Sequence, residues 1–397
     1  MDEEATAVAI VGAGPAGLVL GHLLHGAGIP FVLVDRRSRA DLGGLAKAGA
    51  IEYRTVKLLT EEGIAGTLVH FTVENHRCEF RTADERVVFD YGAMTGGRPH
   101  YIYPQHELVM QLSDALVAVG ADVRFETTVS GVHPDGGGVA VSVTDDAGRT
   151  ATIRAELAVG CDGARSAVAG ALTERSVVEE ALPVRWLALI GNAPPLEPHT
   201  IYAAHPRGFA GQVRRGATFT RFYLEVPVAD TIADWPEARV RDELSVRLDV
   251  DGRLDDVAFV EATLVDLRTR MTSPMQQGPV FLAGDAAHLI TPAGGKGMNL
   301  AIQDAVELAH GLIERLGPRR SGDRLDAYSS VRLPAIWRTQ AFSSWMLRLI
   351  LAGSEVASLD GRPTFGRGVR EGWVYSLQQD PLLARWFAHA YAGVDPD

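Results

Sequence analysis

The chain has 397 residues, of which 38 are Lys or Arg and 50 are Asp or Glu, so its formal net charge is −12. This length suits two packed units, taking about 100–200 residues per domain. An acidic chain lacks the basic footprint that a nucleic-acid backbone requires, so we expect no nucleic-acid partner. The 46% hydrophobic and 22% charged residues exclude disordered and collagen-like classes.

Cysteine usage and the N-terminal segment predict the compartment. Cys78 and Cys161 are the only cysteines, so we expect no disulfide framework and no metal site, and a reducing compartment fits. The uncharged stretch 5–24 is long enough for a membrane helix, but its glycines and its proline favour a strand, a turn and a helix. The start of the chain is acidic, unlike a secretory leader. We expect a cytoplasmic protein without a membrane partner.

The predicted elements begin with a βαβ unit: an apolar strand at 7–11, a helix at 18–26 and a second strand at 31–35. The segment 219–228 mixes polar and apolar residues as an antiparallel strand does. The fold class is therefore α/β, a Rossmann-like unit interrupted by a mixed or antiparallel sheet domain, with a C-terminal helical segment. Further strands are predicted at 138–144, 149–159, 185–190 and 279–283, and helices at 105–119, 298–316 and 323–350.

The first motif, Gly12-Ala-Gly14-Pro-Ala-Gly17, follows a strand and opens a helix. Gly12 permits a tight turn, Gly14 lets the backbone approach a pyrophosphate, and Gly17 lets the helix pack closely on the strand. Asp35 ends the second strand, 21 residues after Gly14, where a carboxylate would bond a ribose hydroxyl. The motif predicts dinucleotide binding without separating FAD from NAD(P).

Two later motifs point to a flavin. Gly160-Cys161-Asp162-Gly163 ends a buried strand, although alone it also fits an ordinary Asp-Gly turn. Gly284-Asp285 ends another strand and precedes a Gly-rich loop that feeds a helix near 298. Asp285 can bond a ribityl alcohol, and the free N–H groups at the helix start can face the edge of an isoalloxazine that becomes anionic on reduction.

Together the three motifs resemble the single-component flavoprotein aromatic hydroxylases, and within them the branch that acts on 4-hydroxybenzoate. The likeness extends over nearly the whole chain, through segments at 201–209, 221–223, 336–337, 342–346 and 391–393. It implies an FAD-binding domain of 1–73, 98–180 and 268–345, a substrate-binding domain of 74–97 and 181–267, and a helical segment of 346–397. It implies FAD contacts at Gly12, Gly14, Gly17, Asp35, Gln105, Asp162, Asp285 and Asn299, and it adds Lys47 and Gly297 to the cofactor-binding residues.

The resemblance also implies a substrate site. Arg215 and Tyr223 match the residues that grip the substrate's carboxylate, and a guanidinium can pair with a carboxylate bidentately. Tyr202, Tyr391 and the carbonyl of Pro292 match the groups that meet its phenol. Without the family context, each tyrosine would be read as a core aromatic with a satisfied hydroxyl, and Arg215 as a solvated strand residue.

Departures from the family pattern bear on the substrate. Val213 stands where the family has a serine that bonds the carboxylate, and Ala293 stands where it has a threonine. The histidine that passes the phenolic proton to solvent has no clear match, and His76 is a candidate.

Other departures bear on the nicotinamide cofactor. Leu45 and Lys47 replace two arginines, so its contacts are altered. A single dinucleotide fingerprint implies that this cofactor binds transiently on the FAD unit. Arg36 and Arg37 could hold a 2′-phosphate, which favours NADPH over NADH.

The resemblance implies a complete reaction. NAD(P)H reduces FAD, O2 adds to give a flavin hydroperoxide, and a 4-hydroxybenzoate-type acid is hydroxylated ortho to its phenol. Val213 and Ala293 raise the alternative of a substituted acid such as 3-amino-4-hydroxybenzoate. A second alternative is a non-oxygenating FAD oxidoreductase or a halogenase, but the chain has no Trp-x-Trp segment of the halogenase kind. The expected assembly is a homodimer.

Overall fold

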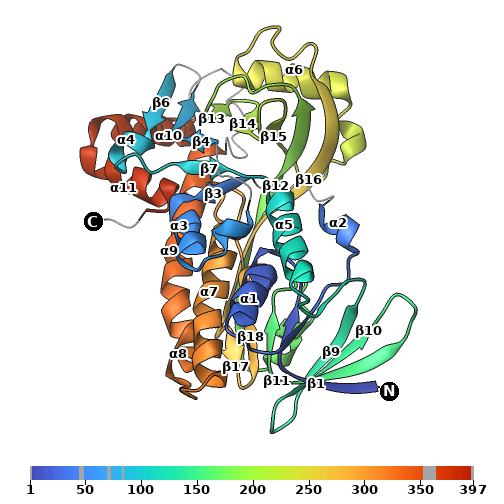
Figure 1. The fold of residues 1–397 in the computed structure, drawn as a ribbon. Coiled ribbons are helices and arrows are strands. Elements are labelled where there is room, and N and C mark those ends of the chain that lie inside the picture. The colour runs from blue at the N-terminus through green and yellow to red at the C-terminus, as the bar shows by residue number, and fades with distance from the viewer. Residues whose placement is uncertain (1, 44–48, 69–72, 83–84, 352–363, 395–397) are drawn as a thin grey trace.

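The computed structural model describes residues 2–43, 49–68, 73–82, 85–351 and 364–394 (Figure 1). Two eight-stranded sheets form its framework, and a three-stranded sheet lies with them. Leu45 and Lys47 lie outside the described residues, so their expected roles stay predictions.

The first sheet has the order β17-β18-β11-β1-β2-β8, and β9 and β10 extend from β11. The neighbours from β18 to β8 pair in parallel, as the apolar runs of its central strands predict. Its strands are β1 (Asp2–Val11), β2 (Phe31–Val34), β8 (Val123–Arg124), β9 (Thr128–Pro134), β10 (Val139–Thr144), β11 (Thr150–Gly160), β17 (Gln276–Gln277) and β18 (Val280–Leu282).

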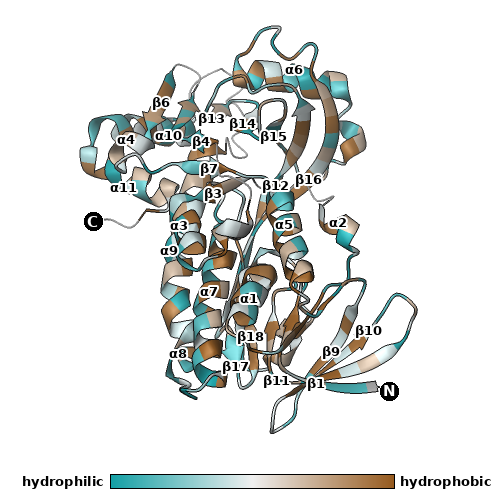
Figure 2. Cartoon of the chain, in the orientation of Figure 1, coloured by the Kyte–Doolittle hydropathy of each residue, from teal (hydrophilic) through white to brown (hydrophobic). Residues whose placement is uncertain are grey.

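Helices cover this sheet. The first is α1 (Pro15–Gly26), which begins with Pro at its first position and buries Leu18, Leu20 and Leu24 fully. It packs on α5 (Gln105–Ala118) and on α7 (Gly297–Leu316). Figure 2 shows hydrophobic residues on α1 and hydrophilic ones at the N-terminal end of β1. Four shorter helices are α2 (Arg39–Gly43), α3 (Tyr53–Glu61), α4 (Tyr91–Met94) and α8 (Asp323–Asp326).

The second sheet has the order β19-β16-β12-β15-β14-β13-β5-β6 and is antiparallel except where β13 pairs with β5. One face packs on α6 (Glu237–Leu248), and the other packs on α9 (Tyr328–Ile350) and α11 (Pro381–Ala392), with α10 (Phe365–Gln379) beside them. Its strands are β5 (Arg77–Arg81), β6 (Arg86–Asp90), β12 (Ser176–Asn192), β13 (Thr200–His205), β14 (Gly208–Arg214), β15 (Thr220–Pro227), β16 (Ala258–Ser273) and β19 (His288–Leu289). The small sheet joins β3 (Ala50–Glu52), β7 (His100–Ile102) and β4 (Glu74–Asn75).

The predicted α/β fold with an interrupting antiparallel sheet is confirmed. The predicted strand 185–190 is only part of β12, and β16 was not predicted, because both strands carry charged pairs such as Arg268 with Glu179 instead of an apolar alternation. The predicted helix 323–350 is two helices, α8 and α9, separated at Ala327. Since β12 and β16 run through 180 and 268, the expected domain boundaries would fall inside strands, and the division stays a prediction.

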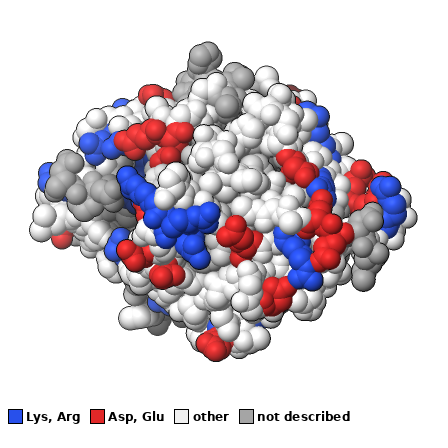
Figure 3. All heavy atoms as spheres, turned by 60° about the horizontal axis from the view of Figure 1, so that its bottom comes forward, with Lys and Arg blue, Asp and Glu red and all other residues white. Residues whose placement is uncertain are grey.

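Surface features add two observations. The face in Figure 3 carries acidic and basic groups interspersed rather than one field of a single sign. Within the described part of the chain, no helix is both long and apolar enough to cross a membrane.

Candidate active site

The three sequence motifs meet at one edge of the first sheet. Val11 is level with Gly160 across β1 and β11, and Gly160 is level with Leu282 across β11 and β18. The hydrogen bonds continue past the strand ends, because Cys161 N donates to Val11 O at 2.7 Å and Ala283 N donates to Gly160 O at 2.9 Å. Ligands of open α/β sheets bind at the carboxyl ends of the strands, so this edge is the expected cofactor site.

The glycines of the first motif differ in what surrounds them. Gly12 has φ +107°, and a Cβ there would collide with Cys161 O, while a Cβ at Gly17 would collide with Gly12 O. At Gly14, a Cβ would meet only Cys161 O, at 3.9 Å. Gly14 also caps α1 without any side-chain hydrogen bond, and the first turn of α1 has no acidic residue. The open side of Gly14 and the uncapped helix start fit a diphosphate.

Asp35 is buried behind this loop and already has protein partners. Its carboxylate accepts from Ala13 N at 2.7 Å and from Arg37 Nε and Nη2 at 3.0 and 2.8 Å. Although burial opposes ionisation, the hydrogen bonds and charge of Arg37 lower the pKa of Asp35. The Asp35 carboxylate therefore holds the Gly-rich loop through Ala13 N and pairs with Arg37.

Asp162 and Asp285 follow the other two strands. Asp162 Oδ2 accepts from Ala167 N at 2.7 Å, whereas its buried Oδ1 has no hydrogen-bond partner among the described residues. Burial raises the pKa of Asp162. Arg270, which sequence reasoning missed, joins the two loops by donating to Ala164 O at 2.6 Å and to Asp285 O at 3.0 Å. The orphan oxygen of Asp162 and the half-buried Asp285 are groups that fit a polyhydroxylated cofactor such as FAD.

A buried cluster holds the turn that carries Asp285. Asp304 of α7 accepts from Gly284 N at 3.0 Å, from Arg332 Nε at 2.7 Å, and from His288. Burial alone would raise the pKa of Asp304, but the charges of His288 and Arg332 outweigh it and lower that pKa. No local sequence motif predicts the roles of Asp304 and Arg332, because the residues that they contact lie on other elements.

Asn299 and Lys296 organise the start of α7. Asn299 Oδ1 accepts from Glu52 N at 3.0 Å, and its Nδ2 donates to Gly295 O at 2.8 Å. Lys296 is 2% exposed, and its Nζ donates to Glu52 Oε1 at 2.6 Å and to the carbonyls of Ala390 and Tyr391. Burial lowers the pKa of Lys296, and the Glu52 carboxylate opposes that shift. Gly297 begins α7, and Gln105 begins α5.

The predicted substrate residues share one face of the second sheet. Tyr202 of β13 is level with Gly211 of β14, and Gly211 is level with Tyr223 of β15. Side chains that are level across adjacent strands point to the same face, so the two tyrosines flank Gly211, over which the ring of Phe209 packs. Trp186 packs on Tyr223 with ring centres 5.1 Å apart. The opposite face bears the apolar residues that pack with α6.

The two predicted phenol-site tyrosines meet. Tyr202 Oη and Tyr391 Oη share a hydrogen bond at 2.9 Å and are buried. Burial raises the pKa of both hydroxyls, so both are neutral at ordinary pH. His100 Nε2 lies 2.6 Å from Tyr391 O, and burial lowers the pKa of His100 to about 3, so the neutral ring donates to that carbonyl. His76 instead lies 3.0 Å from Glu74 at the surface.

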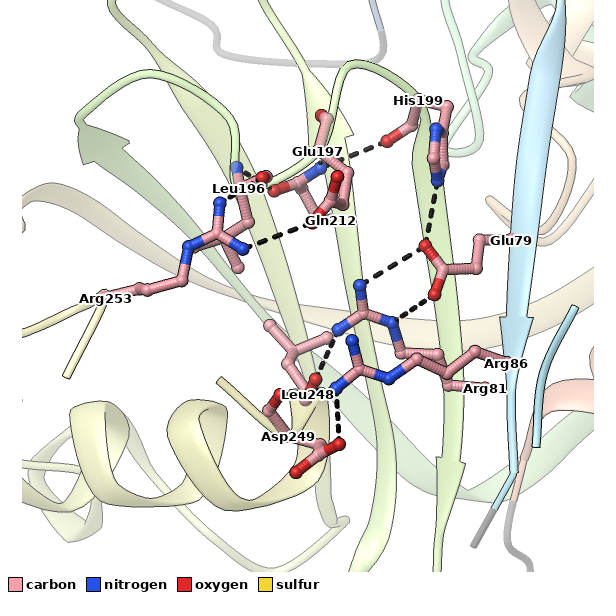
Figure 4. Close-up of polar contacts among 10 residues, drawn as sticks. All are labelled: Glu79, Arg81, Arg86, Leu196, Glu197, His199, Gln212, Leu248, Asp249 and Arg253. Atoms are coloured by element: carbon pink, nitrogen blue, oxygen red, sulfur yellow. Dashed lines mark hydrogen bonds and ion pairs between the residues drawn. The ribbon is translucent and has the colours of Figure 1, made fainter. Parts of the chain in front are cut away.

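An ion network supports the strand that carries Tyr202 (Figure 4). His199 Nε2 lies 2.8 Å from Glu79 Oε2, and Arg81 Nε donates to Glu79 Oε1 at 2.7 Å. Arg81 also donates to Leu248 O at the end of α6. The network thus ties β5 to the residue before β13 and to α6.

Arg215 and Val213 continue the substrate face beyond Gly211 at every second position. Arg215 Nη2 is buried and has no hydrogen-bond partner among the described residues. Burial and the nearby charge of Arg221 lower the pKa of Arg215. Val213 is half-buried and offers no polar atom. An unpaired guanidinium beside an apolar position can accept an anionic group.

Pro292 and Ala293 lie in the loop before α7, and Ala293 belongs to the same buried cluster as Tyr202 and Tyr391. Pro292 O accepts from Gly295 N at 3.0 Å and so closes a turn. Ala293 is 1% exposed, and its carbonyl accepts from Ser343 Oγ at 3.0 Å. Thr291 Oγ1 shares a hydrogen bond with the same Ser343 hydroxyl at 2.9 Å.

Comparison with known proteins identifies the family of this chain. The family model for an FAD binding domain matches residues 5–343. The chain is 32% identical over 354 residues to p-hydroxybenzoate hydroxylase of Acinetobacter baylyi, covering 88% of this chain and 87% of that enzyme. It is also 32% identical to anhydrotetracycline monooxygenase of Streptomyces rimosus, covering 82% of this chain and 66% of that enzyme.

Solved structures show the same fold. One is the structure of BexE, a protein studied for oxidation during BE-7585A biosynthesis. It superposes with a TM-score of 0.78 at 29% identity, and the match covers 99% of this chain and 77% of the BexE chain. The p-nitrophenol 4-monooxygenase of Pseudomonas putida DLL-E4 superposes with a TM-score of 0.78 at 20% identity and covers both chains fully. This chain therefore belongs to the FAD-binding domain family and is a single-component flavoprotein aromatic monooxygenase.

Proposed function

We propose that this enzyme uses NAD(P)H and O2 to hydroxylate a 4-hydroxybenzoate-type acid ortho to its phenol. The observation that carries the proposal is the spacing of Tyr202 and Tyr223 on one sheet face. Two strand spacings separate them, about 10 Å, and the ring of Phe209 covers Gly211 between them. A benzene ring with polar groups at opposite ends suits the gap between the two hydroxyls, with the Phe209 ring as an aromatic floor.

The two ends of the gap differ in chemistry, which orients the ring. Arg215 and Tyr223 supply a positive charge and a hydroxyl for the carboxylate, and Arg215 Nη2 has no other described partner. Tyr202, bonded to Tyr391, meets the phenol. A charged end and a neutral hydroxyl end together favour one direction of binding.

The tyrosine pair is proposed to handle the phenolic proton. Tyr202 can accept a hydrogen bond from the phenol because its own hydrogen can point to Tyr391. Since both tyrosines stay neutral, they hold the phenol by hydrogen bonds and draw its proton away from the phenolic oxygen, which makes the ring a stronger nucleophile. FAD, when bound and reduced, supplies the activated oxygen.

For the nicotinamide cofactor we favour NADPH over NADH. Arg36 is exposed beside the dinucleotide loop, whereas Arg37 is paired with Asp35. Arg36 is thus the arginine better placed to meet a 2′-phosphate. Initial rates with the two cofactors, for the wild type and Arg36→Ala, test this preference: a loss of NADPH preference only in the variant supports it.

The experiment that tests the reaction is product identification from substituted 4-hydroxybenzoates incubated with enzyme, FAD, NADPH and O2. A product carrying one added oxygen ortho to the phenol supports the proposal. If no 4-hydroxylated acid stimulates NADPH oxidation, the proposed substrate class is wrong.

A specific observation favours a second candidate, the same reaction on a substituted acid such as 3-amino-4-hydroxybenzoate. Val213 and Ala293 replace hydroxyl-bearing residues of the resembling family, and both are small or apolar in this site. Fewer fixed polar contacts tolerate added ring substituents better. The non-oxygenating alternative is not retained, because the named relatives are hydroxylases and monooxygenases.

We also propose a homodimer. Five apolar side chains are exposed on α10 and α11, and we call them the C-terminal apolar face: Phe365 (90% exposed), Val369, Trp373, Leu382 (79% exposed) and Trp386. Trp373 and Trp386 both pack on Trp345, with ring centres 5.5 and 5.1 Å away, so the two helices present one continuous face. A second copy of the same face would cover it.

A further inference from the structure

Arg215 has an unpaired neighbour that lies outside the family pattern. His106 is the second residue of α5, and its Nδ1 is buried without a hydrogen-bond partner among the described residues. Buried polar atoms in folded proteins are normally paired, so an orphan atom indicates a missing ligand or water. Two orphan nitrogens, His106 Nδ1 and Arg215 Nη2, therefore require a partner in this region.

The surroundings of Gly49 show that the start of α5, which carries His106, lies near Arg215. A Cβ at Gly49 would lie 3.8 Å from Arg215 Nε and 3.8 Å from the Cα of Pro104, which directly precedes α5. The start of α5 thus comes close to the Arg215 side chain. Arg215 also acts on His106 by charge: burial and that charge lower the pKa of His106, while Glu107 and Glu261 oppose the shift.

Among the described residues, no side chain caps the start of α5. Pro104 caps the helix without a side-chain hydrogen bond, and the acidic Glu107 in the first turn is exposed. On the sheet side, Val213 leaves the substrate face without the hydroxyl that the resembling family places there. A carboxylate has two oxygens and accepts several hydrogen bonds, so Arg215 and Tyr223 leave one acceptor position open.

We propose that His106 donates its Nδ1 hydrogen to the substrate's carboxylate and so takes over the role of the missing serine at Val213. This inference rests on the proposed function. His106 is then a specificity-determining residue: it favours an acid over a neutral analogue of the same shape, because a carboxylate offers an acceptor oxygen to each orphan nitrogen, whereas an amide has one oxygen and presents its NH2 group at the other position.

The test measures dissociation constants of 4-hydroxybenzoate and of its neutral analogue 4-hydroxybenzamide for the FAD-loaded enzyme, by the change in flavin absorbance. We expect His106→Ala to weaken binding of the acid about tenfold and to leave the amide within about twofold. His106→Asn places an amide nitrogen one bond beyond Cγ, as in histidine, and is expected to restore most of the affinity. His133→Ala, an exposed histidine of β9, is the matched control.

The outcomes separate the two claims. If Arg215→Ala weakens acid binding about a hundredfold while His106→Ala changes nothing, the role of His106 is wrong and the proposed function stands. If His106→Ala weakens binding of the acid and of the amide equally, or if His106→Asn does not restore the affinity for the acid, His106 has only a structural role and the inference is wrong. If the wild type binds neither 4-hydroxybenzoate nor 3-amino-4-hydroxybenzoate, the proposed function fails and this inference fails with it.

Discussion

Tyr202 and Tyr391 are 189 residues apart in the chain, yet their hydroxyls share a buried hydrogen bond at 2.9 Å. The bond joins a strand of the second sheet to the last described helix. It can orient the Tyr202 hydroxyl only while α11 stays packed on that sheet.

Tyr391→Phe removes this partner and tests the tyrosine pair. We expect kcat to fall about a hundredfold, because Tyr202 loses the acceptor for its own hydrogen and no longer draws the phenolic proton. FAD content and the dissociation constant of the acid should change little. Tyr375→Phe, at an exposed position of α10, is the matched control. An unchanged kcat would place the proton transfer on other residues.

Gly14→Val tests the dinucleotide loop. Its new side chain meets little protein but occupies the open side that fits a diphosphate, so the variant should fold and lack FAD. Flavin absorbance of the purified protein measures the loss, and circular dichroism checks the fold. Gly26→Ala in the same helix has open space around its Cβ and should load normally. A fully yellow Gly14→Val protein contradicts the assignment.

Val213→Ser tests whether the enzyme prefers an unsubstituted or a substituted 4-hydroxybenzoate. The serine adds a donor next to Arg215, so we expect kcat/KM to shift toward 4-hydroxybenzoate and away from 3-amino-4-hydroxybenzoate. Both acids are assayed with both proteins. A wild type that strongly prefers the unsubstituted acid, with no shift in the variant, rules out the substituted-ring candidate while leaving the hydroxylation proposal intact.

Glu79→Gln tests the ion network of Figure 4. Burial opposes the Glu79 charge, but His199 and Arg81 outweigh it and lower the pKa of Glu79 from 4.5 to about 2. A lowered carboxyl pKa stabilises the fold above pH 4.5, and the gain is lost as pH falls toward 2. We therefore expect the substitution to lower the free energy of unfolding by about 2–3 kcal/mol at pH 7 and by much less at pH 3.

Thermal denaturation of both proteins at the two pH values measures this difference. Glu85 is an exposed residue between β5 and β6, and Glu85→Gln should change Tm little at either pH. If Glu79→Gln lowers Tm equally at both pH values, the packing of the Glu79 side chain, and not its charge, stabilises the fold.

The double variant Phe365→Glu and Leu382→Glu tests the C-terminal apolar face. Light scattering after size exclusion should show a dimer for the wild type and a monomer for the variant, because charges cannot be buried against the same face of a second copy. Val260→Glu alters an equally apolar exposed residue of β16 and should stay dimeric. A monomeric wild type would overturn the homodimer.

The sequence was sufficient for features that are local. Gly12, Asp162 and Asp285 each follow a strand that ends in a short apolar run, and that local pattern predicted where they stand. The second sheet was harder, because the long pair β12 and β16 exposes charged side chains and carries no period-2 apolar signal. Its strand 219–228 was predicted from its mixture of polar and apolar residues, and it corresponds to β15.

Long-range contacts escaped sequence reasoning for a physical reason. Arg270 bridges the loops after β11 and β18, and Asp304 binds the Gly284 turn, but each partner is set by how distant elements pack. Tyr202, Tyr391 and Arg215 were assigned through resemblance, since no spacing rule links them. His100 contacts Tyr391 from the small sheet, which no local pattern predicts.

The alignment of Val11, Gly160 and Leu282 has a consequence for how the protein matures. These three strand ends come from the first, middle and last thirds of the chain, so the edge they form depends on contacts of high sequence separation. Such contacts form slowly and late in folding. A folding intermediate that lacks β18 has only part of the edge, so FAD binds the finished sheet in preference to its precursors. At a hundredfold excess over its dissociation constant, a ligand of this kind adds about 2.7 kcal/mol to the stability of the completed protein. The protein loaded with FAD should therefore unfold at a higher temperature than the same protein without it.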